Sequence, residues 1–320
     1  MKTILLIVIL SFILGFLVKN SLAQSNMTEE IVQIDKIEGT LLVPRVSTTV
    51  PVVLIIAGSG PTDRNGNSGL GITAQSYKLL AEDLAKNNIA SLRYDKRGIG
   101  KSIEAGMKED SLRFEHYIND AAAWVDFLNK DRRFSKVVIL GHSEGSLIGM
   151  VAVQKSKAHI FISLAGAGRP IDEVILQQLK DQKQPENIVN DIASLFAQLK
   201  EGKLIANPNP MYFSLFRPSV QPYMISWLRY NPQIEIKKLT IPTLIVQGTA
   251  DIQVAESEAK LLKDAKPDAQ FLLIDKMNHV LKISSLDRAE NIATYANADL
   301  PLAEALVNSL VKFIKEHGKN

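Results

Sequence analysis

The sequence predicts an α/β fold in which helices cover both faces of a mostly parallel central sheet. From residue 30 onward, short β-rich runs alternate with longer helical patterns. One run, residues 50–57, is apolar throughout and ends in glycines, which is typical of a strand buried on both faces. The alternation breaks between residues 166 and 238 and then resumes, which indicates one domain with a helical insertion.

The N-terminal residues have the pattern of an export signal. Lys2 is followed by an uncharged apolar stretch, residues 3–18, then by Lys19 and a small-x-small site that ends at Ala23. The rival interpretation is an uncleaved membrane anchor, for which this stretch is slightly short. We therefore expect residues 1–23 to be a cleaved signal peptide, and the mature protein to be periplasmic or extracellular without stable membrane association.

Composition excludes several classes of protein. The chain has no cysteine, so it contains neither a disulfide nor a lipid-modified cysteine. Its formal net charge is +3, and loss of Lys2 and Lys19 with the signal would lower it to +1. A charge this small does not indicate a nucleic-acid partner. The sequence does not indicate an oligomeric state.

Residues 24–166 form the first part of the expected core. A hairpin is expected at its start, over residues 31–37 and 39–46. The further strands are expected at residues 50–57, 89–94, 136–140 and 159–164. Helices are expected at residues 72–87, at 114–129, and after Gly145, where apolar residues recur at helical spacing.

Residues 167–238 are expected to form a helical cap. They contain helical patterns at 171–181 and 187–200 and a Pro- and aromatic-rich stretch at 207–227, with no strand pattern. Strands resume at 241–247 and 270–274, so residues 239–320 return to the core, which ends in amphipathic helices. Such a cap would cover the site and set specificity. Its candidate substrate-binding residues are Tyr212, Phe213, Phe216, Tyr223 and Trp227, although for at least half of them simple packing is the favoured role.

The motif Gly141-His142-Ser143-Glu144-Gly145 stands between an expected strand and an expected helix. A sharp strand-to-helix turn needs glycine two residues on either side of the serine, because the neighbouring backbone leaves no room for a Cβ. This context predicts a nucleophile elbow with Ser143 as the nucleophile. The alternative is a glycine-rich turn in which the serine only caps the helix.

A serine nucleophile needs a general base, and elimination among five histidines leaves His279. It follows the expected strand at 270–274, whereas His142 should point away from the site. The other histidines lie in a helix, at the start of a strand and in the C-terminal tail, respectively His116, His159 and His317.

The acid that orients the base is expected after a strand between the serine and the histidine. Asp251 meets this condition, because it follows the strand at 241–247 and a glycine turn. Asp275 is the competitor, but it lies only four residues before His279 and fits a role at the strand end.

Two backbone N–H groups must bind the negative charge of a tetrahedral intermediate. The residue after the nucleophile, Glu144, supplies one, and its side chain is expected only to complement the helix dipole. The second is assigned to Ser59, in the glycine-flanked loop that follows the strand at 50–57. The alternative is a plain turn between strand and helix.

Four segments together resemble bacterial α/β-hydrolases of the serine aminopeptidase S33 superfamily, and more narrowly their exported carboxylesterases. These segments are residues 57–67, residues 94–102, the elbow, and residues 247–251. The resemblance implies the α/β-hydrolase fold, hydrolysis of esters with short acyl groups through an acyl-enzyme on Ser143, and no cofactor or metal.

The oxyanion loop begins Ala57-Gly58, where many relatives have His-Gly, a difference that leaves the mechanism intact. Asp95 and Arg97 are expected to hold their loop by an ion pair. Within hydrolysis, the alternative to an esterase is an aminopeptidase or amidase with the same triad. A lipase for long chains is disfavoured, and a non-catalytic binding protein that retained the fold is the alternative outside enzymes.

Overall fold

A single eight-stranded sheet forms the centre of the computed structural model, which describes residues 26–318. The signal peptide expected at residues 1–23 lies outside the described residues. In chain order the strands are β1 Met27–Ile34, β2 Ile37–Pro44, β3 Val50–Ile56, β4 Ala90–Tyr94, β5 Phe134–His142, β6 Ile160–Leu164, β7 Thr243–Gly248 and β8 Gln270–Ile274.

Their order across the sheet is β1-β2-β4-β3-β5-β6-β7-β8. The hairpin β1–β2 and the β2–β4 pair are antiparallel, and every pair from β4–β3 to β7–β8 is parallel. The carboxyl ends of β3, β5, β7 and β8 therefore lie along one edge of the sheet, where the loops of such folds bind ligands.

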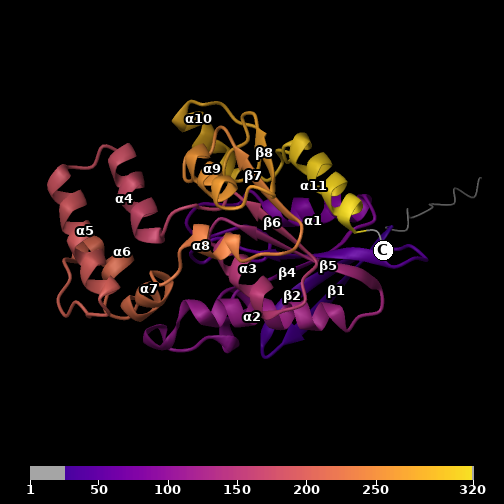
Figure 1. Ribbon diagram of the computed structural model, residues 1–320, viewed down its shortest axis with the longest axis horizontal. Helices are drawn as coiled ribbons and strands as arrows, with labels where there is room; N and C mark the ends of the chain where they lie inside the picture. The colour runs from indigo at the N-terminus through magenta and orange to yellow at the C-terminus, as the bar shows by residue number, and fades with distance from the viewer. Residues whose placement is uncertain (1–25, 319–320) are drawn as a thin grey trace, which may run out of the picture.

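Two helical layers cover the sheet (Figure 1). The core helices are α1 Ser76–Lys86, α2 Phe114–Asn129, α3 Glu144–Lys155, α9 Glu256–Ala265, α10 Arg288–Ala293 and α11 Glu304–His317, with 3-10 turns η1 Gly100–Ala105, η2 Glu109–Ser111 and η4 Thr294–Ala296. Alternate residues of β3 face opposite layers: Leu54 packs in the cluster of α2, α3 and α9, and Val53 in that of α1 and α11. Successive side chains of β3 thus point to opposite faces of the sheet, and both faces are buried. This is why β3 is a continuous apolar run in the sequence.

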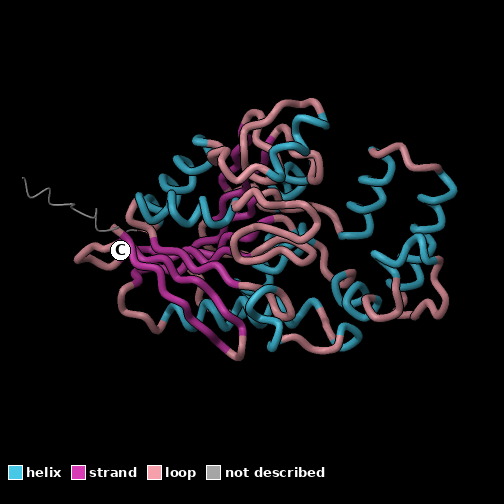
Figure 2. Tube along the Cα trace, turned by 180° about the vertical axis from the view of Figure 1, so that it is seen from behind, coloured by secondary structure: helices cyan, strands magenta, loops and turns pink. Residues whose placement is uncertain are grey.

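The helical insertion lies between β6 and β7 and stands clear of the sheet (Figures 1 and 2). Its elements are α4 Ile171–Asp181, α5 Glu186–Lys200, η3 Pro210–Tyr212, α6 Phe213–Phe216, α7 Gln221–Trp227 and α8 Pro232–Lys237. We call residues 167–238 the cap. Phe196 of α5 packs against Phe216 with ring centroids 4.9 Å apart, so the cap has apolar packing of its own.

Most expected elements are present, and their boundaries differ where the backbone has a special conformation. The helix expected from residue 72 begins only at Ser76, because Gln75 has a left-handed φ of 53° that a helix cannot contain. In the hairpin, β1 begins four residues and β2 two residues earlier than expected. Among residues 26–318, no helix is long and apolar enough to cross a membrane.

Candidate active site

Ser143 occupies a strained turn between β5 and α3. Its φ of 55° and ψ of −123° are rarely adopted by residues other than glycine. A Cβ on Gly141 would lie 2.1 Å from the Gly145 oxygen, and one on Gly145 would lie 2.3 Å from the Ile56 oxygen. Both glycines are therefore sterically required. The serine side chain makes no capping hydrogen bond, which argues against a plain helix cap.

His279 and Asp251 come together from the loops after β8 and β7. Nδ1 of His279 lies 2.8 Å from Oδ2 of Asp251. Burial alone would raise the pKa of Asp251, but the charge of His279 and hydrogen bonds from His279, Val254 and Gln253 outweigh it and lower this pKa. Asp251 therefore stays ionised and can hold the imidazole with its proton on Nδ1.

Asp275, the competing acid, lies elsewhere. It is exposed, and its carboxylate accepts a hydrogen bond from the Thr249 hydroxyl at 3.3 Å. The structure thus brings Asp251, and not Asp275, to His279.

His142 does not point away from the site, contrary to the expectation from sequence. The Gly58 amide donates to the Tyr77 hydroxyl at 3.1 Å, and this hydroxyl lies 2.8 Å from Nδ1 of His142. Nε2 of His142 lies 3.0 Å from the His279 carbonyl, which can only accept, so the ring carries its proton on Nε2 and donates it there. Nδ1 therefore accepts the proton of the Tyr77 hydroxyl. Burial, with the nearby charge of His279, lowers the pKa of His142 to about 3, which keeps the ring neutral.

The expected oxyanion loop lies directly against Ser143. A Cβ added to Gly58 would lie 3.2 Å from Cβ of Ser143, so only glycine allows this approach without displacement. Neither the Ser59 amide nor the Glu144 amide donates a hydrogen bond to another residue in the described part of the chain. Both remain able to bind a ligand oxygen.

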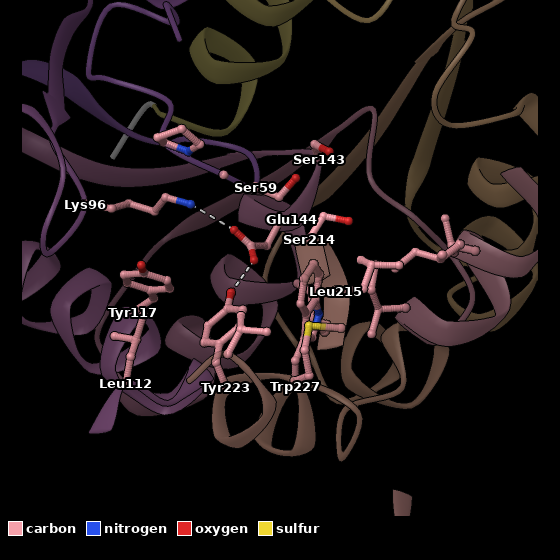
Figure 3. A pocket seen from close by; sticks show the side chains of 18 of the residues that line it. Ser59, Lys96, Leu112, Tyr117, Ser143, Glu144, Ser214, Leu215, Tyr223 and Trp227 are labelled. Atoms are coloured by element: carbon pink, nitrogen blue, oxygen red, sulfur yellow. Dashed lines mark hydrogen bonds and ion pairs between the residues drawn. The ribbon is translucent and has the colours of Figure 1, made fainter. Parts of the chain in front are cut away.

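The Glu144 side chain does more than complement the helix dipole, which corrects a second expectation. It is buried, its Oε2 lies 2.9 Å from Nζ of Lys96, and its Oε1 accepts a hydrogen bond from the Tyr223 hydroxyl (Figure 3). Nζ of Lys96 also donates to the Gly58 carbonyl at 2.6 Å. No role for Lys96 or Tyr77 is predicted from the sequence. The one signal for Lys96 is its place just after an apolar strand.

A cavity of about 720 Å³ opens at Ser143 between the core and the cap. Of the cap aromatics predicted to bind substrate, Tyr223 and Trp227 line it. Tyr212 and Phe216 do not: the Tyr212 hydroxyl donates to Asp191 at 3.2 Å, and Phe216 is buried against Phe196. Packing within α5–α7 holds these two side chains away from the cavity. They therefore stabilise the cap itself. Phe213 is not among the lining residues either and is partly exposed.

The charged residues that line this cavity are all paired with protein groups. Glu144 pairs with Lys96, Glu109 with Arg217, Arg97 with Asp120, and Arg169 with Glu258. The remaining lining is mainly apolar, including Leu112, Leu147, Ile171, Val174 and Met224. Such a chamber favours a neutral ligand with substantial apolar surface.

Asp95 and Arg97 do not pair with each other. Asp95 binds the buried Arg64 at 2.7 Å, and Arg97 binds Asp120 of α2 at 2.6 Å. Both still hold the loop after β4, as expected, but through partners on other segments. The described residues contain no group of three or more His, Asp or Glu side chains that could hold a metal ion.

Comparison with known sequences finds a similar family and a similar protein. The family model described as serine aminopeptidase, S33, matches residues 66–210. The esterase EstD of Thermotoga maritima is 28% identical over 257 residues, which are 79% of this chain and 60% of that protein. The chain thus spans less than two thirds of the length of this relative. These matches confirm the resemblance inferred from the four sequence segments.

Solved structures of low sequence identity share the fold. Est1E from Butyrivibrio proteoclasticus, solved with ferulic acid bound, aligns with a TM-score of 0.57 at 19% identity and covers 89% of this chain and 99% of its own. A thermophilic esterase from Thermogutta terrifontis, with malate bound, aligns with a TM-score of 0.53 at 16% identity, covering 92% and 99%. The predicted α/β-hydrolase fold is therefore confirmed.

Proposed function

We propose that this chain, an α/β-hydrolase similar to the serine aminopeptidase S33 family, is a serine esterase that cleaves neutral carboxylic esters. The observation that carries the proposal is the strained Ser143 turn, which lines a largely apolar cavity. Beside it are the amides of Ser59 and Glu144, which donate no hydrogen bond within residues 26–318. The similarity to esterase EstD supports the same activity.

In the proposed reaction, Oγ of Ser143 attacks the ester carbonyl carbon while Nε2 of His279 takes the hydroxyl proton. The electron pair of the carbonyl moves onto its oxygen, which the amides of Ser59 and Glu144 bind. When the carbonyl re-forms, the alcohol leaves with the proton from His279. Water, activated by the same imidazole, then hydrolyses the acyl-enzyme. Asp251 keeps the imidazole in the required tautomer throughout.

The pairing of charges favours an esterase over an aminopeptidase. An aminopeptidase needs a carboxylate for the ammonium group of its substrate. The two acidic residues that line the cavity, Glu109 and Glu144, already bind Arg217 and Lys96. A free amine would have to displace one of these pairs, whereas a neutral ester would not.

The preference for short acyl groups stays a prediction. A cavity of about 720 Å³ is within the range, about 300–1,000 Å³, that binds whole drug-sized ligands. Bulkier acyl or alcohol groups therefore also fit by volume, and aromatic ones would meet Tyr117 and Trp227.

The test is a series of p-nitrophenyl esters of increasing acyl length, run beside aminoacyl anilides on wild type and on Ser143→Ala. We expect ester turnover that falls by about 10⁶-fold in the variant, because the triad acts as a unit. Turnover retained by Ser143→Ala would overturn the mechanism. A preference for anilides would favour the aminopeptidase, and failure of a fluorophosphonate to label wild type would favour a non-catalytic binding protein.

We further propose that the protein acts after export, in the periplasm or outside the cell. The supporting observation is the N-terminal pattern that ends at Ala23. Cell fractionation with N-terminal sequencing tests it, and a protein that begins with Met1 in the cytoplasm would contradict it.

A further inference from the structure

Lys96 is a buried charge for which the reaction described above has no use. It lies two residues after the end of β4, is 1% exposed, and lies over the Tyr117 ring at 4.9 Å from the centroid. Its ammonium group reaches two acceptors, the Gly58 carbonyl at 2.6 Å and the Glu144 carboxylate at 2.9 Å. Each acceptor belongs to one side of the expected oxyanion hole.

The contact with Gly58 controls the neighbouring amide. In a planar trans peptide the C=O and the N–H point in opposite directions, and the described residues contain no cis peptide. When Lys96 holds the Gly58 oxygen, it therefore turns the Ser59 N–H of the same peptide unit the opposite way. The preceding amide, the Gly58 N–H, is held separately by Tyr77. The peptide between Gly58 and Ser59 thus has little freedom to rotate.

The contact with Glu144 acts on the other donor. The Glu144 amide is the first N–H of α3, and its carboxylate lies between the Lys96 ammonium and the Tyr223 hydroxyl. Figure 3 shows Ser59 and Ser143 on the same side of this carboxylate. One ammonium group therefore joins the two segments whose amides must converge on one oxygen.

We propose that Lys96 is a positioning residue of the oxyanion hole, which sets the relative orientation of the Ser59 and Glu144 amides through Gly58 and the Glu144 carboxylate. This inference rests on the proposed esterase function and deepens it. Lys96 touches no reacting atom; it acts by reducing the reorganisation that the two donors would otherwise need when charge develops.

The test is Lys96→Met, which keeps the apolar stem and removes the ammonium group. Loss of one oxyanion donor reduces kcat about 10²–10³-fold, so we expect misorientation of the donors to reduce kcat by about 10- to 100-fold while KM changes less than about twofold. A trifluoromethyl ketone, whose adduct with Ser143 places an oxyanion in the hole, should lose affinity by the same factor as kcat/KM. A purely structural role would lower the melting temperature and leave both values unchanged in the folded protein.

A matched control exists far from the site. Lys266 is also buried, donates to the Leu239 carbonyl at 2.8 Å and pairs with Asp268 at 2.8 Å. Lys266→Met should lower stability without changing kcat or the affinity for the ketone.

If Lys96→Met does not fold, the double variant Lys96→Met/Glu144→Gln removes the unpaired buried carboxylate and should restore folding while keeping the defect in kcat. An active wild type together with an unchanged kcat in a folded Lys96 variant would overturn this inference and leave the proposed esterase function standing. An inactive wild type would instead overturn the proposed function.

Discussion

The imidazole of His142 packs against that of His279, with ring centroids 4.7 Å apart, and donates a hydrogen bond from Nε2 to the main-chain oxygen of His279. The residue before Ser143 thus supports the backbone of the proposed base. Through Tyr77 the same ring is linked to the Gly58 amide of the oxyanion loop. This chain of buried hydrogen bonds joins the loop at Gly58, the residue before Ser143 and the main chain of His279.

His142→Leu should reduce kcat. The change leaves the His279 carbonyl and the Tyr77 hydroxyl without their partner, at about 1–3 kcal/mol for each unsatisfied buried group. If about 1.4 kcal/mol of this cost raises the activation free energy of the reaction, kcat falls about tenfold. Steady-state kinetics with a p-nitrophenyl ester measure it. His159→Leu is the control, because His159 accepts a hydrogen bond from the Val137 amide, five residues before His142 in β5. This change should leave kcat unchanged.

The stability of the protein should depend on pH through His142. Its pKa is about 3 in the folded protein and about 6.5 when unfolded, so the unfolded chain binds more protons between these values. The free energy of unfolding therefore has its full value above pH 6.5. It decreases as the pH falls toward 3, by up to about 1.4 kcal/mol per pH unit. Urea unfolding from pH 7 to pH 4 measures this slope. His142→Leu should show a shallower slope than wild type, and equal slopes would contradict the assignment.

Asp251→Asn should reduce kcat by about 10⁴-fold, because an amide in place of the carboxylate favours the wrong tautomer of His279. KM should change little, since Asp251 does not line the cavity. Asp275→Asn is the matched control: this exposed carboxylate contacts Thr249 and should be replaceable without loss of activity. The reverse result would reassign the acid to Asp275.

Tyr223→Phe should loosen the cap. Its hydroxyl donates to the buried Glu144 carboxylate, and a hydrogen bond to a charged group contributes about 1.5–3 kcal/mol. We expect a lower free energy of unfolding in urea and a raised KM, because Tyr223 also lines the cavity. Tyr212→Phe removes a hydroxyl that donates to Asp191 within the cap, and it should change KM little. Equal KM values for the two variants would contradict the inference that the Tyr223 hydroxyl holds the cap against the core.

Local pattern and steric necessity were enough to predict much of this protein from its sequence. Alternation of strands and helices predicts the parallel sheet, and 3.6-residue periodicity locates α2 and α4 to the residue. The elbow is readable because its glycines are required by the turn itself, whatever surrounds it. The pairing of Asp251 with His279 follows from chain order, since carboxyl ends of parallel strands share one edge of the sheet.

Only the tertiary structure decided which side chains support these residues. Lys96 meets Glu144 across 48 positions of sequence and Tyr77 meets His142 across 65, and no local pattern encodes such contacts. The sequence also could not predict which cap aromatics line the cavity. Tyr223 lines it and Phe216 packs inside the cap, although both lie in similar sequence. Apolar character predicts that a side chain is buried, whereas the packing of separate segments determines which surface buries it.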